Sequence, residues 1–279
     1  MNFGGIEEKY TDYANSPVVI LPVPFDATST WIRGADRGPE AILEASANME
    51  LYDIQTHSEV YLKGIHTADP VGLSTDPVSM VVEVKTSISQ YLSDGKLPVI
   101  IGGNHSVTIG AVRACAEQLG RITVLQLDAH TDLRPEYDGT PLSHASAMAR
   151  AVEVADIVQV GIRSMCVEEL PFLQPERIFY AHDISGQNDW YARASSLING
   201  PVYLTIDLDV FDPSVLPSTG TPEPGGMTYN EVYRFLSYII EHHQIIGFDV
   251  VELCPNESEK SSDFLASKLI YQLISLIKK

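Results

Sequence analysis

Short apolar runs alternate with amphipathic segments along the whole chain. The runs consist mainly of Val, Ile and Leu without a polar break, which is typical of strands buried on both faces. They predict strands at residues 18–24, 98–101, 122–132, 157–162, 177–180, 202–209 and 245–253, with a further short strand near 60–65. The segments between them predict helices at residues 39–46, 76–93, 106–119, 145–155, 189–199, 228–242 and 261–279.

This alternation predicts an α/β fold with a mostly parallel sheet of about eight strands and helices on both faces. Repeats, low-complexity tracts and linkers do not interrupt it, so residues 1–279 are expected to form one domain. A closed eight-fold barrel has the same alternation and is the alternative fold. In open parallel sheets, ligands bind at the carboxyl ends of the strands.

Three of the predicted strands end in residues that can bind metal ions: His105, Asp128, His130, Asp132, Asp207 and Asp209. Extended backbone would point alternate residues in the same direction, and such a cluster of acids would be costly without a cation. Two imidazoles and four carboxylates are too many ligands for one tetrahedral zinc ion. The set predicts two bridged, oxygen-preferring ions, with manganese favoured over zinc or magnesium.

Two further residues are candidates for catalysis. Glu252 lies at a mainly apolar position of the last predicted strand, where an ionised carboxylate needs a protein cation or a positively charged substrate group. A planar guanidinium would satisfy it with two hydrogen bonds. His144 follows the loop after Asp132 and could transfer protons, because imidazole titrates near neutral pH. Each residue alone is more often structural, but their place beside the metal ligands favours a functional role.

The charge of the chain restricts its partners. It has 18 Lys and Arg against 37 Asp and Glu, a formal net charge of −19. This argues against nucleic acid and anionic membranes as partners and favours a small cationic molecule. The three cysteines are widely spaced, which argues against a disulfide framework. A secretion signal and a membrane-spanning segment are both missing from the sequence, so a cytoplasmic location is expected.

Several segments together resemble the signature segments of the arginase/agmatinase (ureohydrolase) family, in the order of that family and across nearly the whole chain. They are Gly102-Gly-Asn-His105, Asp128-Ala-His-Thr-Asp132, Ser143-His144, Asp207-Leu-Asp-Val-Phe-Asp-Pro213, Gly220-Thr-Pro-Glu-Pro-Gly-Gly226 and Asp249-Val-Val-Glu252. The resemblance implies a three-layer α/β/α fold, two bridged Mn²⁺ ions and hydrolysis of a guanidino C–N bond. It also implies assembly into homo-trimers or homo-hexamers.

The resemblance further implies roles for single residues. One side of the metal pair would be bound by His105, Asp128, Asp132 and Asp209, and His130 and Asp207 would complete the pair. Asp128, Asp132 and Asp207 are the candidates for bridging the two ions. A bridging hydroxide would attack the guanidinium carbon while Glu252 holds the guanidinium. Asp209 could take up the remaining proton, and His144 would pass a proton to the departing amine. Thr221 is a weaker candidate for substrate binding.

The loop after Asp132 bears on the choice of substrate. Arginase relatives hold the α-amino and α-carboxylate groups with Asn and Ser there, whereas this chain has Leu133 to Tyr137. Glu136 and Asp138 would suit a distal ammonium, so agmatine, cleaved to putrescine and urea, is the expected substrate.

Arg134 is evidence against agmatine, because a guanidinium in the pocket would repel it and attract a carboxylate. Guanidino acids such as 4-guanidinobutanoate and 3-guanidinopropanoate, and also N-formimidoylglutamate and arginine, therefore stay open as substrates. A non-catalytic metal-binding relative is the remaining alternative.

Overall fold

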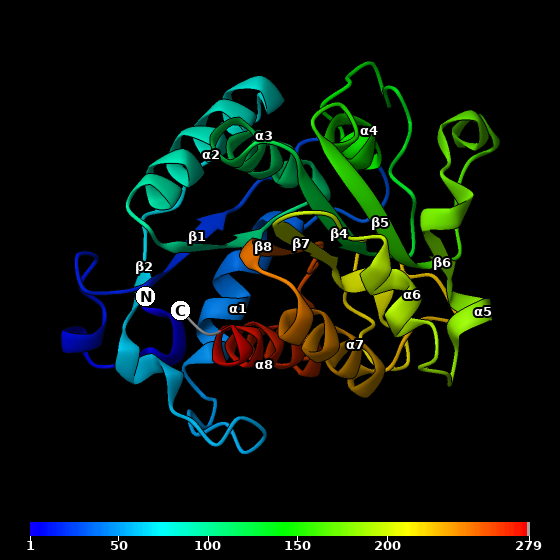
Figure 1. Ribbon diagram of the computed structural model, residues 1–279. Helices are drawn as coiled ribbons and strands as arrows, with labels where there is room; N and C mark the ends of the chain where they lie inside the picture. Colours follow the sequence, from blue (N-terminus) through cyan, green and yellow to red (C-terminus); the bar gives the residue numbers. More distant parts are fainter. Residues whose placement is uncertain (278–279) are drawn as a thin grey trace.

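Eight parallel strands form one open sheet in the computed structural model, which describes residues 1–277 (Figure 1). In sheet order the strands are β2 (Ile65–Thr67), β1 (Val18–Val23), β3 (Leu97–Gly102), β8 (Ile245–Val251), β7 (Val202–Asp207), β4 (Ile122–Leu127), β5 (Ala155–Ile162) and β6 (Ile178–Tyr180). Because β2 and β6 are edges that do not pair with each other, the sheet is not closed. The predicted parallel sheet is confirmed, and the alternative barrel is wrong.

Helices cover both faces of the sheet (Figure 1). One face carries α2 (Pro77–Ser93), α3 (Thr108–Leu119) and α4 (Ala147–Ala151), and the other carries α1 (Gly38–Ser46), α6 (Tyr191–Ser196), α7 (Tyr229–His242) and α8 (Ser261–Leu276). The short helix α5 (Ala181–Ile184) follows β6. Strand residues alternate between the two layers, since Val18 and Ile20 pack on one side and Leu21 and Val23 on the other. This is the three-layer α/β/α fold.

Local sequence signals set where the helices begin. Asp76 caps α2 by accepting hydrogen bonds from the backbone N–H groups of Val78 and Ser79, and Pro77 occupies the first helical position. Thr228 and Glu231 form a reciprocal capping box at the start of α7. These caps satisfy backbone donors that would otherwise lack partners at the helix ends.

Several predicted elements have different bounds in the structure, among them one strand and one helix. Residues 60–63 form a 3₁₀ helix rather than a strand, and β2 begins only after Gly64, whose φ of 100° ends that helix. The helix predicted at 145–155 ends at Ala151, and Ala155 already belongs to β5. Alanine suits both a helix and a buried strand, so composition could not place this boundary.

The strands that carry the predicted site residues lie side by side in the middle of the sheet. Their order is β3-β8-β7-β4, and His105, Glu252, the Asp207–Asp209 pair and the Asp128–Asp132 segment follow their respective carboxyl ends. The chain crosses over several times to produce this order, so residues far apart in sequence share one edge. Among residues 1–277, none of the helices combines the length and apolar character needed to cross a membrane.

Candidate metal centre and active site

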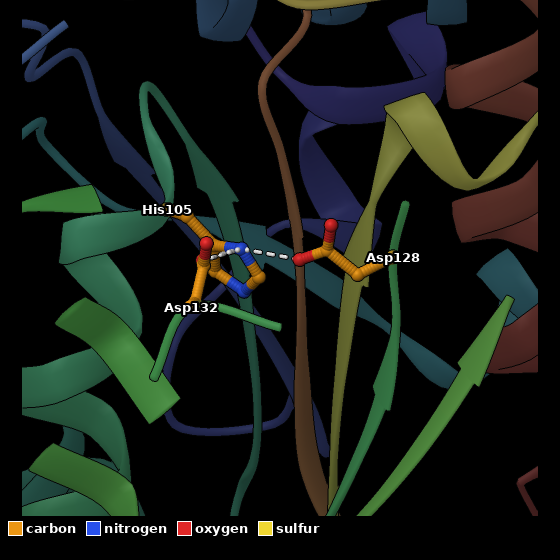
Figure 2. Close-up of side chains that lie close together, drawn as sticks. All are labelled: His105, Asp128 and Asp132. Atoms are coloured by element: carbon orange, nitrogen blue, oxygen red, sulfur yellow. Dashed lines mark ion pairs between the residues drawn. The ribbon is translucent and has the colours of Figure 1, made fainter. Parts of the chain in front are cut away.

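Three carboxylates surround one ring nitrogen of His105. Its Nδ1 lies 3.0 Å from Asp128 Oδ2, 3.0 Å from Asp132 Oδ2 and 3.3 Å from Asp207 Oδ2. Figure 2 shows Asp128 and Asp132 reaching the imidazole from opposite sides. All four side chains are buried at the carboxyl ends of β3, β4 and β7. We call this group the His105 cradle.

A second group forms around His130. Its Nδ1 lies 2.9 Å from Asp209 Oδ2 and 3.6 Å from Asp128 Oδ1. We call His130, Asp128 and Asp209 the His130 cradle. Asp128 therefore belongs to both cradles, with one oxygen in each. The grouping differs from the one implied by the family resemblance, because Asp209 lies with His130 rather than with His105.

The charge balance of the cradles tests whether cations fit between them. His105 Nδ1 is buried and has no hydrogen-bond partner in the described part of the chain, although it faces three carboxylate oxygens. Burial, reinforced by Asp128, raises the pKa of Asp132 to about 7. Burial also lowers the pKa of His130, but Asp209 and Asp128 outweigh this and raise it to about 12. The cradles thus favour added positive charge, and the donor set fits two divalent ions.

The candidate ligands after β4 converge because the chain turns there, not because it is extended. The strand β4 ends at Leu127, and the backbone N–H of His130 donates a hydrogen bond of 2.6 Å to Asp128 Oδ1. Asp132 has a left-handed φ of 52°. The expectation that alternate positions on extended backbone would aim these side chains together was wrong, since turn residues after the strand perform this function.

Glu252 is a buried acid that lines the same cavity as the cradles and has no Lys or Arg partner among the described residues. It follows β8 rather than lying within it, and its Oε1 accepts a hydrogen bond of 2.7 Å from the backbone N–H of His105. Within residues 1–277 no Lys or Arg pairs with it, and burial raises its pKa to about 8. The sequence led us to expect either a protein cation or a positively charged substrate group beside Glu252. Within residues 1–277, a Lys or Arg partner is ruled out.

Gly103 allows the backbone beside Glu252 to pack closely. The carbonyl of Gly103 accepts a hydrogen bond of 2.7 Å from the N–H of Glu252. A Cβ at position 103 would lie 2.0 Å from the carbonyl oxygen of Phe25, closer than atoms can approach. The Gly-Gly turn before His105 is thus required by packing.

His144 lies in the cavity wall and is uncharged at neutral pH. Burial, together with the positive charges of His105 and His130, lowers its pKa to about 4. Its backbone N–H lies 3.3 Å from Thr28 Oγ1, and its ring meets the edge of Tyr137 at 5.8 Å between centroids. A neutral imidazole there can accept a proton before it donates one.

The cradles open into a cavity of about 220 Å³. Nine of the ten predicted site residues line it, and Asp128 is buried beside them. Thr221 Oγ1 lies 3.4 Å from Asp209 Oδ2. Arg134 also lines the cavity, with its guanidinium 4.4 Å from the centroid of the Tyr137 ring and its Nε 3.9 Å from Glu169 Oε2.

The acids expected to hold a distal ammonium lie elsewhere. Glu136 and Asp138 are exposed and do not line the cavity, because the loop between Tyr137 and Thr140 turns outward through two backbone hydrogen bonds. The buried acid in this part of the wall is Glu169.

Sequence reasoning missed Glu169, which organises the wall of the cavity. Its Oε1 accepts hydrogen bonds from Thr131 Oγ1 and the Leu133 N–H, and its Oε2 accepts one from the Cys166 N–H. The contacts with Thr131 and Leu133 join segments more than 30 residues apart, and the local Glu-Glu pair resembles any exposed acidic turn.

Arg163 was also missed as a structural residue of the site. Its guanidinium donates to the backbone carbonyls of Asp209 at 2.6 Å and Glu223 at 2.8 Å. It therefore fastens residues 220–226 to the end of β7. These carbonyls lie 46 and 60 residues further along the chain, so the local sequence does not indicate the contact.

Comparison with known proteins places this geometry in context. Residues 16–275 match the sequence model of the Arginase family. An N(1)-aminopropylagmatine ureohydrolase from Synechocystis sp. is 37% identical over 278 residues, covering 96% of this chain and 91% of the relative. An agmatinase from Pyrococcus horikoshii is 31% identical, covering 95% and 93%. The solved agmatine ureohydrolase of Thermoplasma volcanium aligns with a TM-score of 0.88 at 28% identity, covering 99% of this chain and 94% of that one.

Proposed function

The chain belongs to the arginase family, and we propose that it is a binuclear manganese hydrolase that releases urea from agmatine or from N1-aminopropylagmatine. The observation that carries this proposal is Glu252, a buried carboxylate without a Lys or Arg partner among residues 1–277, next to two cradles that favour cations. A guanidinium is the group that satisfies a carboxylate with two parallel hydrogen bonds. The names of the relatives supply the substrate candidates.

The two cradles would hold the metal pair. His105, Asp128, Asp132 and Asp207 would hold one ion, and His130, Asp209 and the second oxygen of Asp128 the other. Mixed imidazole and carboxylate ligands suit manganese. When bound, such ions lower the pKa of water to near neutrality and so supply a nucleophile at physiological pH.

The side chains around the cavity would orient the substrate and move protons. Glu252, fixed by the His105 N–H, would hold the guanidinium. Asp209, whose Oδ2 lies close to the Thr221 hydroxyl, would accept a proton. His144 is neutral at pH 7, so it would take up a proton and pass it to the departing nitrogen. Urea and the amine would leave.

Two features support an amine without a carboxylate as the substrate. The Asn and Ser clamp of arginase relatives is replaced by the segment from Leu133 to Tyr137. Glu169 lies 3.9 Å from Arg134 and offsets the positive charge of its guanidinium, which weakens repulsion of a cationic substrate. One observation favours a second candidate, however. Arg134 lines the cavity instead of pointing into solvent, so a guanidino acid or N-formimidoylglutamate could pair with it.

Urea release from a panel of substrates tests these proposals. The Mn²⁺-loaded protein is assayed with agmatine, N1-aminopropylagmatine, arginine, 4-guanidinobutanoate and N-formimidoylglutamate, and the substrates are ranked by kcat/KM. We expect the two carboxylate-free amines to lead by tenfold or more, about 1.4 kcal/mol of transition-state discrimination. A lead for a carboxylated compound that vanishes in Arg134→Ala would favour the second candidate. Full metal loading without urea from any compound would indicate a non-catalytic relative.

We also propose that the protein forms homo-trimers or homo-hexamers. Large apolar side chains support this, because Trp31 is 69% exposed and Leu73 is 70% exposed, and aromatic residues are enriched at interfaces. Light scattering after size-exclusion chromatography measures the assembly, and a monomer at micromolar concentration would contradict it.

A further inference from the structure

A chain of hydrogen bonds runs from His105 into the core, away from the cavity. His105 Nε2 lies 2.8 Å from Thr205 Oγ1, and the Thr205 hydroxyl lies 2.6 Å from Asp249 Oδ1. Thr205 and Asp249 come from the neighbouring central strands β7 and β8, and both are fully buried. Neither residue touches the cavity.

Asp249 acts as an acceptor toward every group around it. Its Oδ2 is 2.9 Å from the Thr108 hydroxyl and 2.9 Å from the Tyr203 hydroxyl, and Thr205 donates to Oδ1. The described residues offer it no Lys or Arg partner. A carboxylate in the core is costly to bury, and three hydroxyl donors offset part of that cost.

The protons along this chain determine the tautomer of His105. The Thr205 hydroxyl has one proton, and this proton is given to Asp249. The oxygen of Thr205 can then only accept from His105, so Nε2 carries the imidazole proton. An imidazole that binds a cation is neutral and keeps one proton, which leaves the lone pair on Nδ1, the atom that faces Asp128, Asp132 and Asp207. Nδ1 is the nitrogen that a cation in the His105 cradle would need.

We propose that Asp249, acting through Thr205, is a positioning residue that holds His105 in the Nε2-protonated tautomer and thereby strengthens cation binding in the His105 cradle. The proposal rests on the metal pair of the proposed function. Groups that hydrogen-bond to metal-binding histidines raise metal affinity by about 10- to 100-fold in other proteins. If Asp249 only filled the core with a polar side chain, asparagine would serve equally well, and Asp249→Asn would leave metal binding unchanged.

Matched variants of Thr205 and Asp249 test this proposal. Mn²⁺ binding to the metal-free wild-type protein, Thr205→Val, Thr205→Ser and Asp249→Asn is measured by calorimetry and by electron paramagnetic resonance of the bound ion. We expect Thr205→Val and Asp249→Asn to lower the affinity for one of the two Mn²⁺ ions by about 10- to 100-fold. Thr205→Ser keeps the hydroxyl and should bind Mn²⁺ as tightly as the wild-type protein. Tyr203→Phe removes only a donor on the far oxygen of Asp249 and should also bind like the wild type.

The nitrogen-15 shifts of His105 provide a second measurement. In the Zn²⁺-loaded wild-type protein, the protonated nitrogen should be Nε2; protonation at Nδ1 would overturn the proposal. Equal Mn²⁺ affinity in Thr205→Val and Thr205→Ser would overturn it as well, and this pair suffices if Asp249→Asn does not fold. A wild-type protein that binds no Mn²⁺ would instead contradict the proposed function on which the inference rests.

Discussion

Glu252 and Asp132 both occupy left-handed backbone, with φ of 66° and 52°. For a residue with a Cβ this conformation costs about 1–2 kcal/mol. Both side chains line the same cavity, so the strain is located where the carboxylates are needed. Strain at such positions persists only when the surrounding structure enforces it.

Replacing Glu252 by glycine separates stability from activity. Glycine adopts positive φ freely, and the change also removes a buried carboxylate, so we expect the free energy of unfolding of the metal-free protein to rise by about 1 kcal/mol. Urea release should be lost, because no group then holds the guanidinium. Chemical denaturation and the urea assay measure the two effects. Glu252→Gln keeps the side-chain shape and the strain, and should lose activity without the gain in stability.

The raised pKa of Glu252 predicts how the metal-free protein responds to pH. Burial raises this pKa to about 8 in the folded state, whereas the pKa of an unfolded Glu is about 4.3. Between pH 6.5 and 8 the folded state therefore binds more protons than the unfolded state, and its stability falls as the pH rises. His130, with a pKa raised to about 12, acts in the same direction.

His144 opposes this trend only near pH 6.5, where the unfolded imidazole is still partly protonated while the folded one, with its pKa lowered to about 4, is neutral. Melting temperatures of the metal-free protein across pH 6.5–8 measure the effect. Glu252→Gln should show a shallower decline than the wild type. A melting temperature that rises over this range would contradict the expected direction.

At the level of elements, two side chains hold the loop 220–226: Asp212, which accepts hydrogen bonds from the N–H groups of Gly225 and Gly226, and Arg163. Arg163 donates to the carbonyls of Asp209 and Glu223, and a Cβ on Gly226 would lie 2.7 Å from its Nη2. We expect Arg163→Lys to destabilise the fold by about 2 kcal/mol, since one ammonium cannot replace several guanidinium hydrogen bonds. Chemical denaturation measures this change.

The same substitution should also increase the proteolysis of loop 220–226, because this loop is fastened through Arg163. Arg121→Lys, which alters an exposed pair with Asp156, is the matched control and should change stability by about 0.5 kcal/mol or less. Equal effects of the two substitutions would indicate that Arg163 does not fasten the loop.

The central strands could be predicted from sequence because burial on both faces leaves an uninterrupted apolar run. The edge strand β2 lacks such a run, since only Ile65 of its three residues is buried, and it was placed several residues too early. The ends of β4, β7 and β8 were each placed too late by up to five residues. There the polar side chains leave the sheet in turns, and alternation of polar and apolar residues does not distinguish a turn from a strand.

The residues of the site also fall into those that could be predicted from the sequence and those that could not. The ligand residues were visible because they cluster at strand ends with unusual chemistry. Glu169 and Arg163 were not, because they act on backbone groups far away in sequence. The grouping of the ligands into two cradles depends on side-chain directions after each turn, which spacing alone does not define. The positions of Glu136 and Asp138 were misjudged for the same reason.

For the whole molecule, both helical layers pack on one shared sheet, so loss of the sheet edge that carries the site should affect the entire fold. We propose that the chain unfolds as a single unit. Mn²⁺ at 100 times its dissociation constant should raise the free energy of unfolding by ~2.7 kcal/mol for each independent site. Thermal unfolding with increasing Mn²⁺ measures this stabilisation, and a chelator should reverse it. Two separated transitions, or no response to Mn²⁺, would contradict the expectation.

Asp128 offers one oxygen to each cradle, and this sharing has a consequence for the order in which ions arrive. A first ion bound there would fix the orientation of the common carboxylate and so prepare the second position before it is filled. Loading should therefore be cooperative, and half-loaded molecules should be scarce at every ion concentration. Cells with little free metal would then contain two populations, fully competent enzyme and inert protein, with few intermediates between them.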